Sequence, residues 1–350
     1  MEFTVVQEEL KVALDAVKRA SSTKLIFAQL GNVLVSAGDG LSLRCTDLDL
    51  YIDKKIPAQV KEEGQASIPV AVLSEFISSL PNDKVTIKSK EGSVSVKCGR
   101  FSANLKTLPV DDFPVPGVVE GSVEVDGDAF ASAAGSVIHA VAQDDSRPVL
   151  SGLFFSGEHV IGADGFRVAR ASFPYSGKPM IVPLRAAKEM LRAATGTIQI
   201  GANDNLAVLK TETMELGCRL ISGGFPDVDR VLPKGGSATV TVSVAELTNT
   251  IRAISVFDKI KVKMEIGETF ILSGQEAEVG DNTATCPAEI TGPGLTIAAS
   301  PKFLMDLLGA VGAEKIMFVL EKPTTPILIK VPSNDQYVAV IMPLNLNRNV

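Results

Sequence analysis

One segment of the sequence occurs three times at a nearly constant interval, in residues 68–87, 180–200 and 297–319. In each copy a short apolar strand leads through Pro or Ser into a helix with apolar residues at three- and four-residue spacing, and a second apolar strand follows. Each helix also carries one acidic residue at its centre, and these acids (Glu75, Glu189 and Asp306) lie 114 and 117 residues apart. A fixed internal period outweighs the prior of about 150 residues per domain that chain length alone suggests. We therefore predict three similar domains, at residues 1–117, 118–235 and 236–350.

Each third also opens on a repeated strand and helix, beginning near Phe3, Val123 and Val240. Between the two helices lie alternating runs such as 32–37 and 41–45, which are separated by glycine-rich turns and are typical of antiparallel strands. Two helices on one face of an antiparallel sheet define an α+β domain. The predicted fold is thus three repeated α+β domains.

The composition is that of an ordinary globular protein, and it argues against several classes. The N-terminus lacks a basic flank followed by a signal-length apolar stretch, and no run of 18 apolar residues occurs, so we expect a cytoplasmic protein without a membrane anchor. The four cysteines are far apart and form no Cys-x-x-Cys pair. This spacing argues against a zinc site and a disulfide framework, and we expect reduced, mostly buried thiols.

Catalytic patterns are also missing from the sequence. The two histidines, His139 and His159, have no neighbouring residues that would complete a nucleophile–base pair, and there is no phosphate-binding Gly-x-x-x-x-Gly-Lys loop. The acidic pairs Asp47/Asp49 and Asp144/Asp145 lack a third ligand at suitable spacing, and such pairs in turns are more often caps. We expect no enzymatic activity, no cofactor and no metal.

Four stretches carry a resemblance to a known family: 147–152 (RPVLSG), 163–168 (ADGFRV), 225–233 (FPDVDRVLP) and 340–344 (VIMPL). Their order and spacing, together with the threefold period, make the chain resemble the bacterial sliding clamp, the β subunit of DNA polymerase III. That resemblance implies a homodimer that closes head to tail into a ring around double-stranded DNA. It also implies as partners a replicative polymerase catalytic subunit, a clamp loader and other proteins with a clamp-binding motif.

In that family a peptide pocket lies between the second and third domains. Apolar residues bordered by arginines also favour such a site, and methionine suits a surface that accepts several partners. An ordinary core at a domain junction would have a similar composition. The matching residues are Arg147, Leu150, Gly165, Phe166, Arg167, Val168, Pro226, Arg230, Val231, Val340, Ile341, Met342, Pro343 and Leu344. The chain departs from the family at Phe166, where a histidine is common, and at residues 347–350, which extend past the usual end.

The resemblance further places DNA contacts at Lys24, Arg185, Lys302 and Phe303. The predicted helices carry eight basic and nine acidic residues, and the whole chain has a net charge of −7, which is unfavourable for a simple groove-binding protein. A ring avoids this objection because it stays on DNA by surrounding the duplex and does not need to bind it tightly. Weak contacts to phosphates, without contacts to the bases, allow the ring to slide.

For the subunit contact we expect the strand around Phe101 and Ala103 of one chain to meet Ser255, Val256 and Phe257 of another. Such a contact between unlike surfaces gives a ring only if the rotation that relates neighbouring subunits closes on itself. The sequence leaves two alternatives open. One is a peptide-binding scaffold of the same fold that does not enclose DNA, which the weak basic balance favours slightly. The other is a small-molecule enzyme, which the missing catalytic groups disfavour.

Overall fold

The structure is a computed structural model of the chain, and it describes residues 1–22, 27–144, 146–276, 278 and 280–346. The described chain forms two compact units. The first contains residues 1–127 and 188–220, and the second contains residues 128–187 and 221–350. The predicted Lys24 and residues 347–350 lie outside the described residues.

The helices of the described residues repeat in length as well as in order. They are α1 (Gln7–Val17), α2 (Val70–Ser79), α3 (Gly127–Val137), α4 (Leu184–Ala193), α5 (Val244–Ile254) and α6 (Pro301–Ala310). The first helix of each third has 11 residues and the second has 10. Short 3-10 turns are η1 (Lys18–Ala20), η2 (Ala28–Gly31), η3 (Val110–Asp112), η4 (Ile138–Ala140), η5 (Pro148–Leu150) and η6 (Val228–Arg230). The predicted pair of helices in each third is confirmed.

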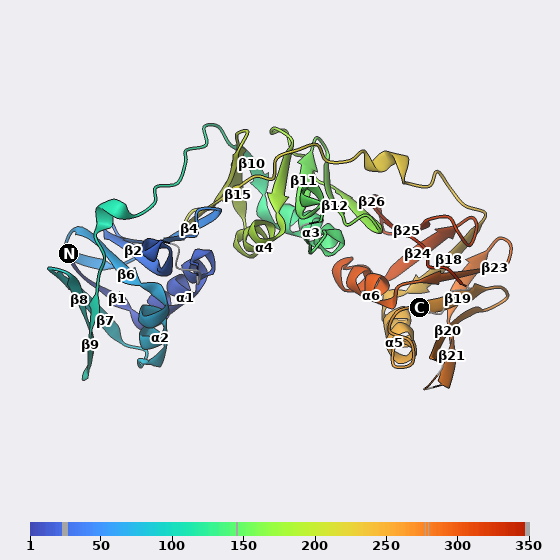
Figure 1. Cartoon of the computed structure of the whole chain (residues 1–350), viewed down its shortest axis with the longest axis horizontal. Coiled ribbons are helices and arrows are strands. Elements are labelled where there is room, and N and C mark those ends of the chain that lie inside the picture. The colour runs from blue at the N-terminus through green and yellow to red at the C-terminus, as the bar shows by residue number, and fades with distance from the viewer. Residues whose placement is uncertain (23–26, 145, 277, 279, 347–350) are drawn as a thin grey trace. The chain divides into compact units, whose positions relative to one another are not determined.

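The first unit holds two antiparallel sheets. The five-stranded sheet has the order β5 (Gln59–Glu62), β1 (Glu2–Val6), β7 (Lys84–Lys90), β8 (Ser93–Cys98), β9 (Phe101–Lys106). The eight-stranded sheet has the order β10 (Val123–Asp126), β15 (Thr197–Ala202), β16 (Leu206–Lys210), β17 (Met214–Arg219), β4 (Leu50–Ile56), β3 (Leu41–Thr46), β2 (Asn32–Ala37), β6 (Gly64–Pro69). Helix α1 packs on β3 and β4 and lies beside α2 (Figure 1).

The second unit repeats this arrangement. Its nine-stranded sheet has the order β14 (Met180–Pro183), β11 (Gly152–Ser156), β12 (His159–Ala163), β13 (Arg167–Ser172), β26 (Asn334–Ile341), β25 (Ile327–Val331), β24 (Lys315–Leu320), β18 (Ala238–Ser243), β22 (Ala288–Thr291). Its four-stranded sheet has the order β21 (Gly280–Cys286), β20 (Phe270–Glu276), β19 (Val262–Ile266), β23 (Leu295–Ala299). Helix α5 packs on β20 and β21 and lies beside α6 (Figure 1). Helices on antiparallel sheets confirm the predicted α+β class.

The two largest sheets each join strands from consecutive thirds of the chain. In the first unit β17 pairs with β4, and in the second unit β26 pairs with β13. The two joints have the same backbone geometry. The Arg219 N–H donates to the Asp49 carbonyl oxygen over 2.8 Å, and the Met342 N–H donates to the Phe166 carbonyl oxygen over 2.8 Å. The repeat therefore extends to the way in which one third continues into the next.

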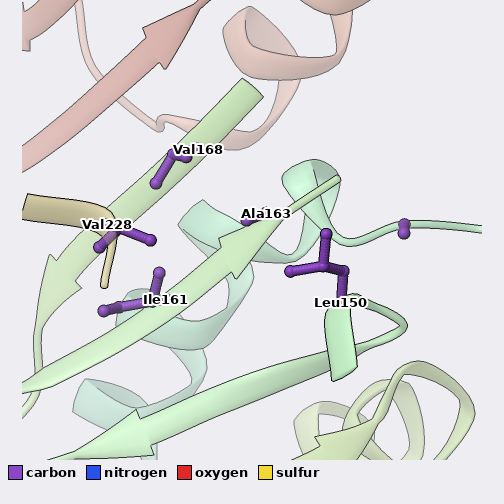
Figure 2. Packing of buried hydrophobic residues seen from close by; sticks show 6 residues of the cluster. Leu150, Ile161, Ala163, Val168 and Val228 are labelled. Atoms are coloured by element: carbon purple, nitrogen blue, oxygen red, sulfur yellow. The ribbon is translucent and has the colours of Figure 1, made fainter. Parts of the chain in front are cut away.

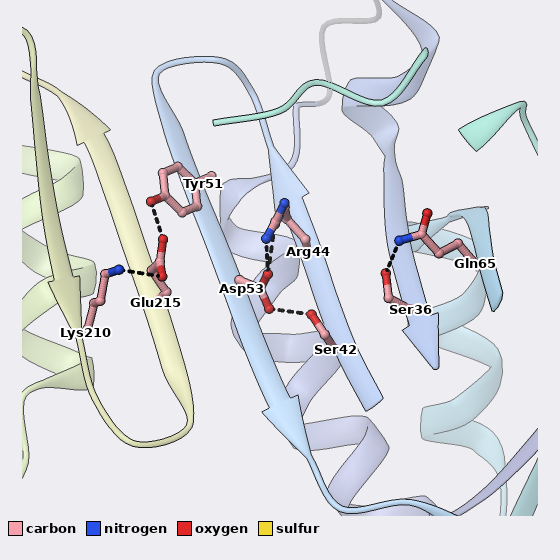
Figure 3. A network of polar contacts seen from close by, with 8 residues as sticks. All are labelled: Ser36, Ser42, Arg44, Tyr51, Asp53, Gln65, Lys210 and Glu215. Atoms are coloured by element: carbon pink, nitrogen blue, oxygen red, sulfur yellow. Dashed lines mark hydrogen bonds and ion pairs between the residues drawn. The ribbon is translucent and has the colours of Figure 1, made fainter. Parts of the chain in front are cut away.

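Figure 3 shows the polar contacts at the joint of the first unit. The Tyr51 hydroxyl on β4 donates to Glu215 on β17 over 2.7 Å, and the Arg44 Nε donates to Asp53 over 2.9 Å. Gly217 lies opposite Tyr51, and a Cβ atom at this glycine would lie 2.2 Å from the tyrosine ring. Because Tyr51 is buried, burial raises the pKa of its hydroxyl, which stays protonated at neutral pH. A side chain at Gly217 would displace the Tyr51 ring from its place against β17.

The cores of the two units contain most of the apolar residues that define the repeat, such as Leu14, Ile77, Leu247 and Leu304. All four cysteines are buried and unpaired, which confirms the predicted buried thiols. In the described part of the chain, no helix is long and apolar enough to cross a bilayer.

Candidate peptide-binding surface and its supporting contacts

A small hydrophobic cluster forms the base of the predicted peptide site. Figure 2 shows Leu150, Ile161, Ala163, Val168 and Val228 packed together, and Ala142 completes the cluster. Val149, Phe154 and Phe225 pack against it from the side, and the rings of Phe154 and Phe225 stack with centroids 4.7 Å apart. The site therefore rests on a buried apolar base that includes residues of η5, β12, β13 and η6.

A tight turn between β12 and β13 presents the first exposed residue of the site. The Asp164 carboxylate accepts hydrogen bonds from the N–H groups of Phe166 and Arg167, each over 2.9 Å. Gly165 has a φ of 90°, which favours glycine, and a Cβ atom there would lie 3.0 Å from the Arg147 Nη1. The turn leaves the Phe166 side chain 65 % exposed. The structure thus brings Arg147, Gly165 and Phe166 together.

The end of β26 supplies the second part of the surface. Val340 pairs with Val168, so their side chains lie on the same face of the sheet. Beyond the strand, Met342 is held to the turn by its hydrogen bond to the Phe166 carbonyl, and its side chain is 42 % exposed. The Leu344 N–H donates to the Ala298 carbonyl oxygen over 2.8 Å, which anchors the segment containing Pro343.

The segment around η6 supplies the third part. Val228 packs into the cluster of Figure 2, and Leu232 packs against a neighbouring cluster of Val319, Leu328 and Val340. An ion pair of 2.6 Å between Arg170 and Asp229 also attaches this segment to β13. Arg230 and Val231, which lie between these anchors, and Pro226, which precedes them, are exposed. The segment therefore crosses both apolar clusters and adds to the exposed surface.

We call the exposed side chains of Phe166, Val231 and Met342, with Arg147 and Arg230, the apolar patch. It has a buried apolar base, three apolar groups and two guanidinium groups. Solvent-exposed apolar groups of this kind are typical of protein interaction sites.

Five predicted peptide-site residues have buried side chains: Leu150, Arg167, Val168, Val340 and Ile341. Of these, Arg167 and Ile341 pair with each other across the strands. Arg167 is only 4 % exposed and donates to Asp164 over 2.9 Å and to Asp306 on α6 over 2.8 Å. Its guanidinium lies 4.3 Å from the centroid of the Phe303 ring. The Arg167 side chain thus connects β13 to α6 and lies apart from the exposed residues. Because Arg167 and Val168 are consecutive in a strand, their side chains point to opposite faces.

The charges of Arg167, Asp164 and Asp306 also act on His139, which lies on η4. Burial, followed by the positive charge of Arg167, lowers the pKa of His139 to about 4, and the carboxylates of Asp306 and Asp164 oppose this shift. The imidazole is therefore neutral at neutral pH. Neither ring nitrogen has a hydrogen-bond partner within the described chain, and no base–nucleophile pair is formed.

The predicted DNA contacts lie at the beginnings of the second helices. Arg185 is the second residue of α4 and Lys302 is the second residue of α6, and both are exposed. Phe303 follows Lys302 but is half-buried, with its ring against Arg167. The described residues contain no group of three or more histidine, cysteine or acidic side chains arranged to hold a metal ion.

The predicted subunit contacts lie at sheet and helix ends. Phe101 and Ala103 lie on β9, which is an edge strand of the five-stranded sheet. Ser255, Val256 and Phe257 follow the end of α5, and Val256 is 70 % exposed.

Comparisons with known proteins cover nearly the whole chain. Three family models match in sequence order: the N-terminal domain of the DNA polymerase III beta subunit at residues 1–116, the central domain at 124–227 and the C-terminal domain at 229–345. The chain belongs to the DNA polymerase III beta subunit family. The boundaries that we predicted at 117 and 235 remain predictions of where each domain ends.

Individual members of the beta subunit family align with the chain from end to end. The beta sliding clamp of Pseudomonas aeruginosa is 28 % identical, and the alignment covers 99 % of this chain and all of the relative. The structure of a sliding clamp from the same organism bound to griselimycin is 26 % identical, with a TM-score of 0.94 and coverage of 99 % and 100 %. A beta sliding clamp from C. crescentus is 25 % identical, with a TM-score of 0.91 and the same coverage.

Within the beta subunit family fold, the sequence pattern did not reveal several supporting residues. Asp164, Phe225 and Asp229 support the apolar patch but lie in motifs that can be read simply as turns, and Phe154 lies within the apolar strand β11. Asp306 did give a signal, because the central acid of its helix occurs in all three thirds. The repeat did not show what this acid contacts, and the structure shows Asp306 in an ion pair with Arg167.

Proposed function

We propose that this chain is a DNA sliding clamp of the cytoplasm, a non-catalytic processivity factor that encircles double-stranded DNA as a head-to-tail homodimer. It would tether the replicative DNA polymerase catalytic subunit, and other proteins with a clamp-binding motif, to DNA. A clamp loader would open the ring and place it on DNA. The observation that carries this proposal is the match to all three beta subunit domains, in order and over almost the full length.

The apolar patch is the proposed binding surface for the partner peptides. A bound segment would cover Phe166, Val231 and Met342 and place its polar groups near Arg147 and Arg230. Leu150, Val168 and Val340 would support it from below, and Pro226, Gly165, Pro343 and Leu344 would set the shape of the rim. Arg167 and Ile341 would contribute through their backbone and through the contacts that hold the site. We propose that griselimycin, which binds the Pseudomonas aeruginosa clamp, also binds here.

Two of the sheet-edge strands in the described chain, β9 and β21, support the homodimer. β9 is at one edge of the five-stranded sheet in the first unit, and β21 is at one edge of the four-stranded sheet in the second. Both strands leave backbone N–H and C=O groups available for pairing with another chain. Because the two edges belong to different units, pairing β9 of one chain with β21 of another is a heterologous contact. Such contacts form a closed ring only if the rotation that relates neighbouring subunits returns to the first subunit. Arg185 and Lys302, and by family resemblance Lys24 and Phe303, would then contact the enclosed DNA.

A scaffold that binds peptides without enclosing DNA is the second candidate, and the net charge of −7 favours it. The mass in solution separates the two. We expect sedimentation at micromolar concentration to give a particle of twice the chain mass of 36.9 kDa. A monomer that persists at tens of micromolar would contradict the ring and would favour the scaffold.

A further inference from the structure

The acid at the centre of the second helix occupies the same position in all three thirds. Glu75, Glu189 and Asp306 are each the sixth residue of a ten-residue helix, in α2, α4 and α6 respectively. A charged residue repeated at one position of a repeated structure indicates a shared contact.

In two of the three helices the structure shows that contact. Glu189 of α4 accepts from the Arg19 Nε on η1 over 2.6 Å, and its own side chain is buried. Asp306 of α6 accepts from Arg167 over 2.8 Å, and α6 packs against η4. In both cases the acid of one third pairs with an arginine of the third before it in the chain. The acid position is constant, whereas the arginine comes from a helix end in one case and from a strand in the other.

Helix α2 belongs to the first of the three thirds, and one of its faces is exposed. Glu75 is exposed and forms no ion pair or hydrogen bond with another side chain among the described residues. Val72, one turn earlier at the third position of the helix, is 51 % exposed. The residues at that position in the other two helices are covered: Ala186 is buried, and Phe303 lies against Arg167. The face that is covered in α4 and α6 is therefore uncovered in α2.

The end of α5, in the last of the three thirds, is the matching open surface, because Val256 there is 70 % exposed. Val256 lies two residues after α5, as Arg19 lies two residues after α1 and His139 two residues after α3. The turn that follows is well ordered by Asp258, which is buried and accepts from the N–H groups of Ile260 and Lys261 over 2.9 and 2.8 Å. Lys259 lies in this turn, is exposed, and has no ionic partner within the described part of the chain.

We propose that Glu75 of α2 forms an ion pair with Lys259 of a second copy of this chain. Glu189 and Asp306 pair with a basic residue of their own chain, whereas Glu75 would make the equivalent contact across the subunit boundary. Val72 would then pack on the apolar end of α5, at Val256. This inference rests on the proposed homodimer and assigns residues to it. The repeat supports this inference. Within the chain, α4 and α6 each contact the preceding third, and the exposed face of α2 and the exposed end of α5 are the surfaces left for a third contact of this kind.

A charge-swap series tests the pair. We expect Glu75→Lys to raise the dimer dissociation constant about tenfold, because it places two cations together, and Lys259→Glu to do the same by placing two anions together. The double variant should return to within about threefold of the natural chain, since it restores opposite charges. The effects of the single substitutions should shrink as salt is added. Glu63→Lys, which makes the same charge change at an exposed turn between β5 and β6, should leave the constant unchanged.

Sedimentation over a range of concentrations measures all four variants, and circular dichroism checks that each is folded. Single variants that dimerise like the natural chain, or a double variant no tighter than the singles, would overturn the Glu75–Lys259 pair while leaving the dimer intact. A natural chain that never dimerises would instead remove the proposed ring, and this pair with it.

Discussion

Replacing Met342 with aspartate weakens binding of a peptide from the clamp-binding segment of the polymerase catalytic subunit by about 100-fold, the range expected when the centre of an interface is disrupted. Met342 is fixed by its backbone hydrogen bond to Phe166, and its apolar side chain is one of the three exposed apolar groups of the apolar patch. A carboxylate there would have to lose its hydration beneath an apolar peptide group. Fluorescence anisotropy with a labelled peptide measures the change.

Leu48→Asp is the matched control for this substitution. Leu48 is also an exposed apolar residue, at the turn of the first third that corresponds to Gly165, where Asp47 accepts the same pair of backbone hydrogen bonds. It lies outside the apolar patch, so its replacement should leave the affinity unchanged. If Met342→Asp binds the peptide as well as the natural chain does, the patch is not the peptide site.

Replacing Arg167 with alanine lowers the free energy of unfolding of the second unit by about 3–5 kcal/mol, the usual cost of removing one partner of a buried ion pair. The substitution leaves the Asp164 and Asp306 carboxylates without their shared cation and removes the group that covers the Phe303 ring. Lysine should not restore the lost stability, because a single ammonium group cannot replace the two-sided fork of the guanidinium. Urea denaturation followed by circular dichroism measures the loss.

Arg230→Ala is the control for the loss of an arginine. Arg230 pairs with Asp227 three residues earlier, but its side chain is 84 % exposed. An exposed pair contributes about 0.2–1 kcal/mol, so this variant should unfold almost as the natural chain does. An equal, small effect for Arg167→Ala and Arg230→Ala would show that Arg167 does not hold α6 to β13.

The sequence predicted the repeat, the helices and the fold class because these depend on local periodicity. The mid-helix acids were visible for the same reason, since they recur with the apolar residues around them. The pairing of β17 with β4 and of β26 with β13 was not predictable, because strands from different thirds meet through backbone hydrogen bonds that any residue can form. The sequence suggested a separate sheet for each third, and the structure shows two large sheets that each include strands from two thirds.

The candidate site illustrates the same limit. The motifs predicted that Arg147, Gly165, Phe166 and Met342 share one peptide-binding surface, and the structure brings these four residues close together. The motifs could not show that the Arg167 side chain points away from this surface. Which face of β13 is exposed depends on what packs against each side of the strand. One side is covered by α6, which lies more than a hundred residues further along the chain.

Retention on DNA tests the central claim, which is that the chain acts by enclosure. The protein is loaded by its clamp loader and ATP onto a nicked circular duplex, and the amount bound is measured after transfer to high salt. The account predicts that the protein stays on the circle, because a closed ring needs few phosphate contacts, and that it leaves once the circle is cut. Equal retention on circular and linear DNA would contradict enclosure.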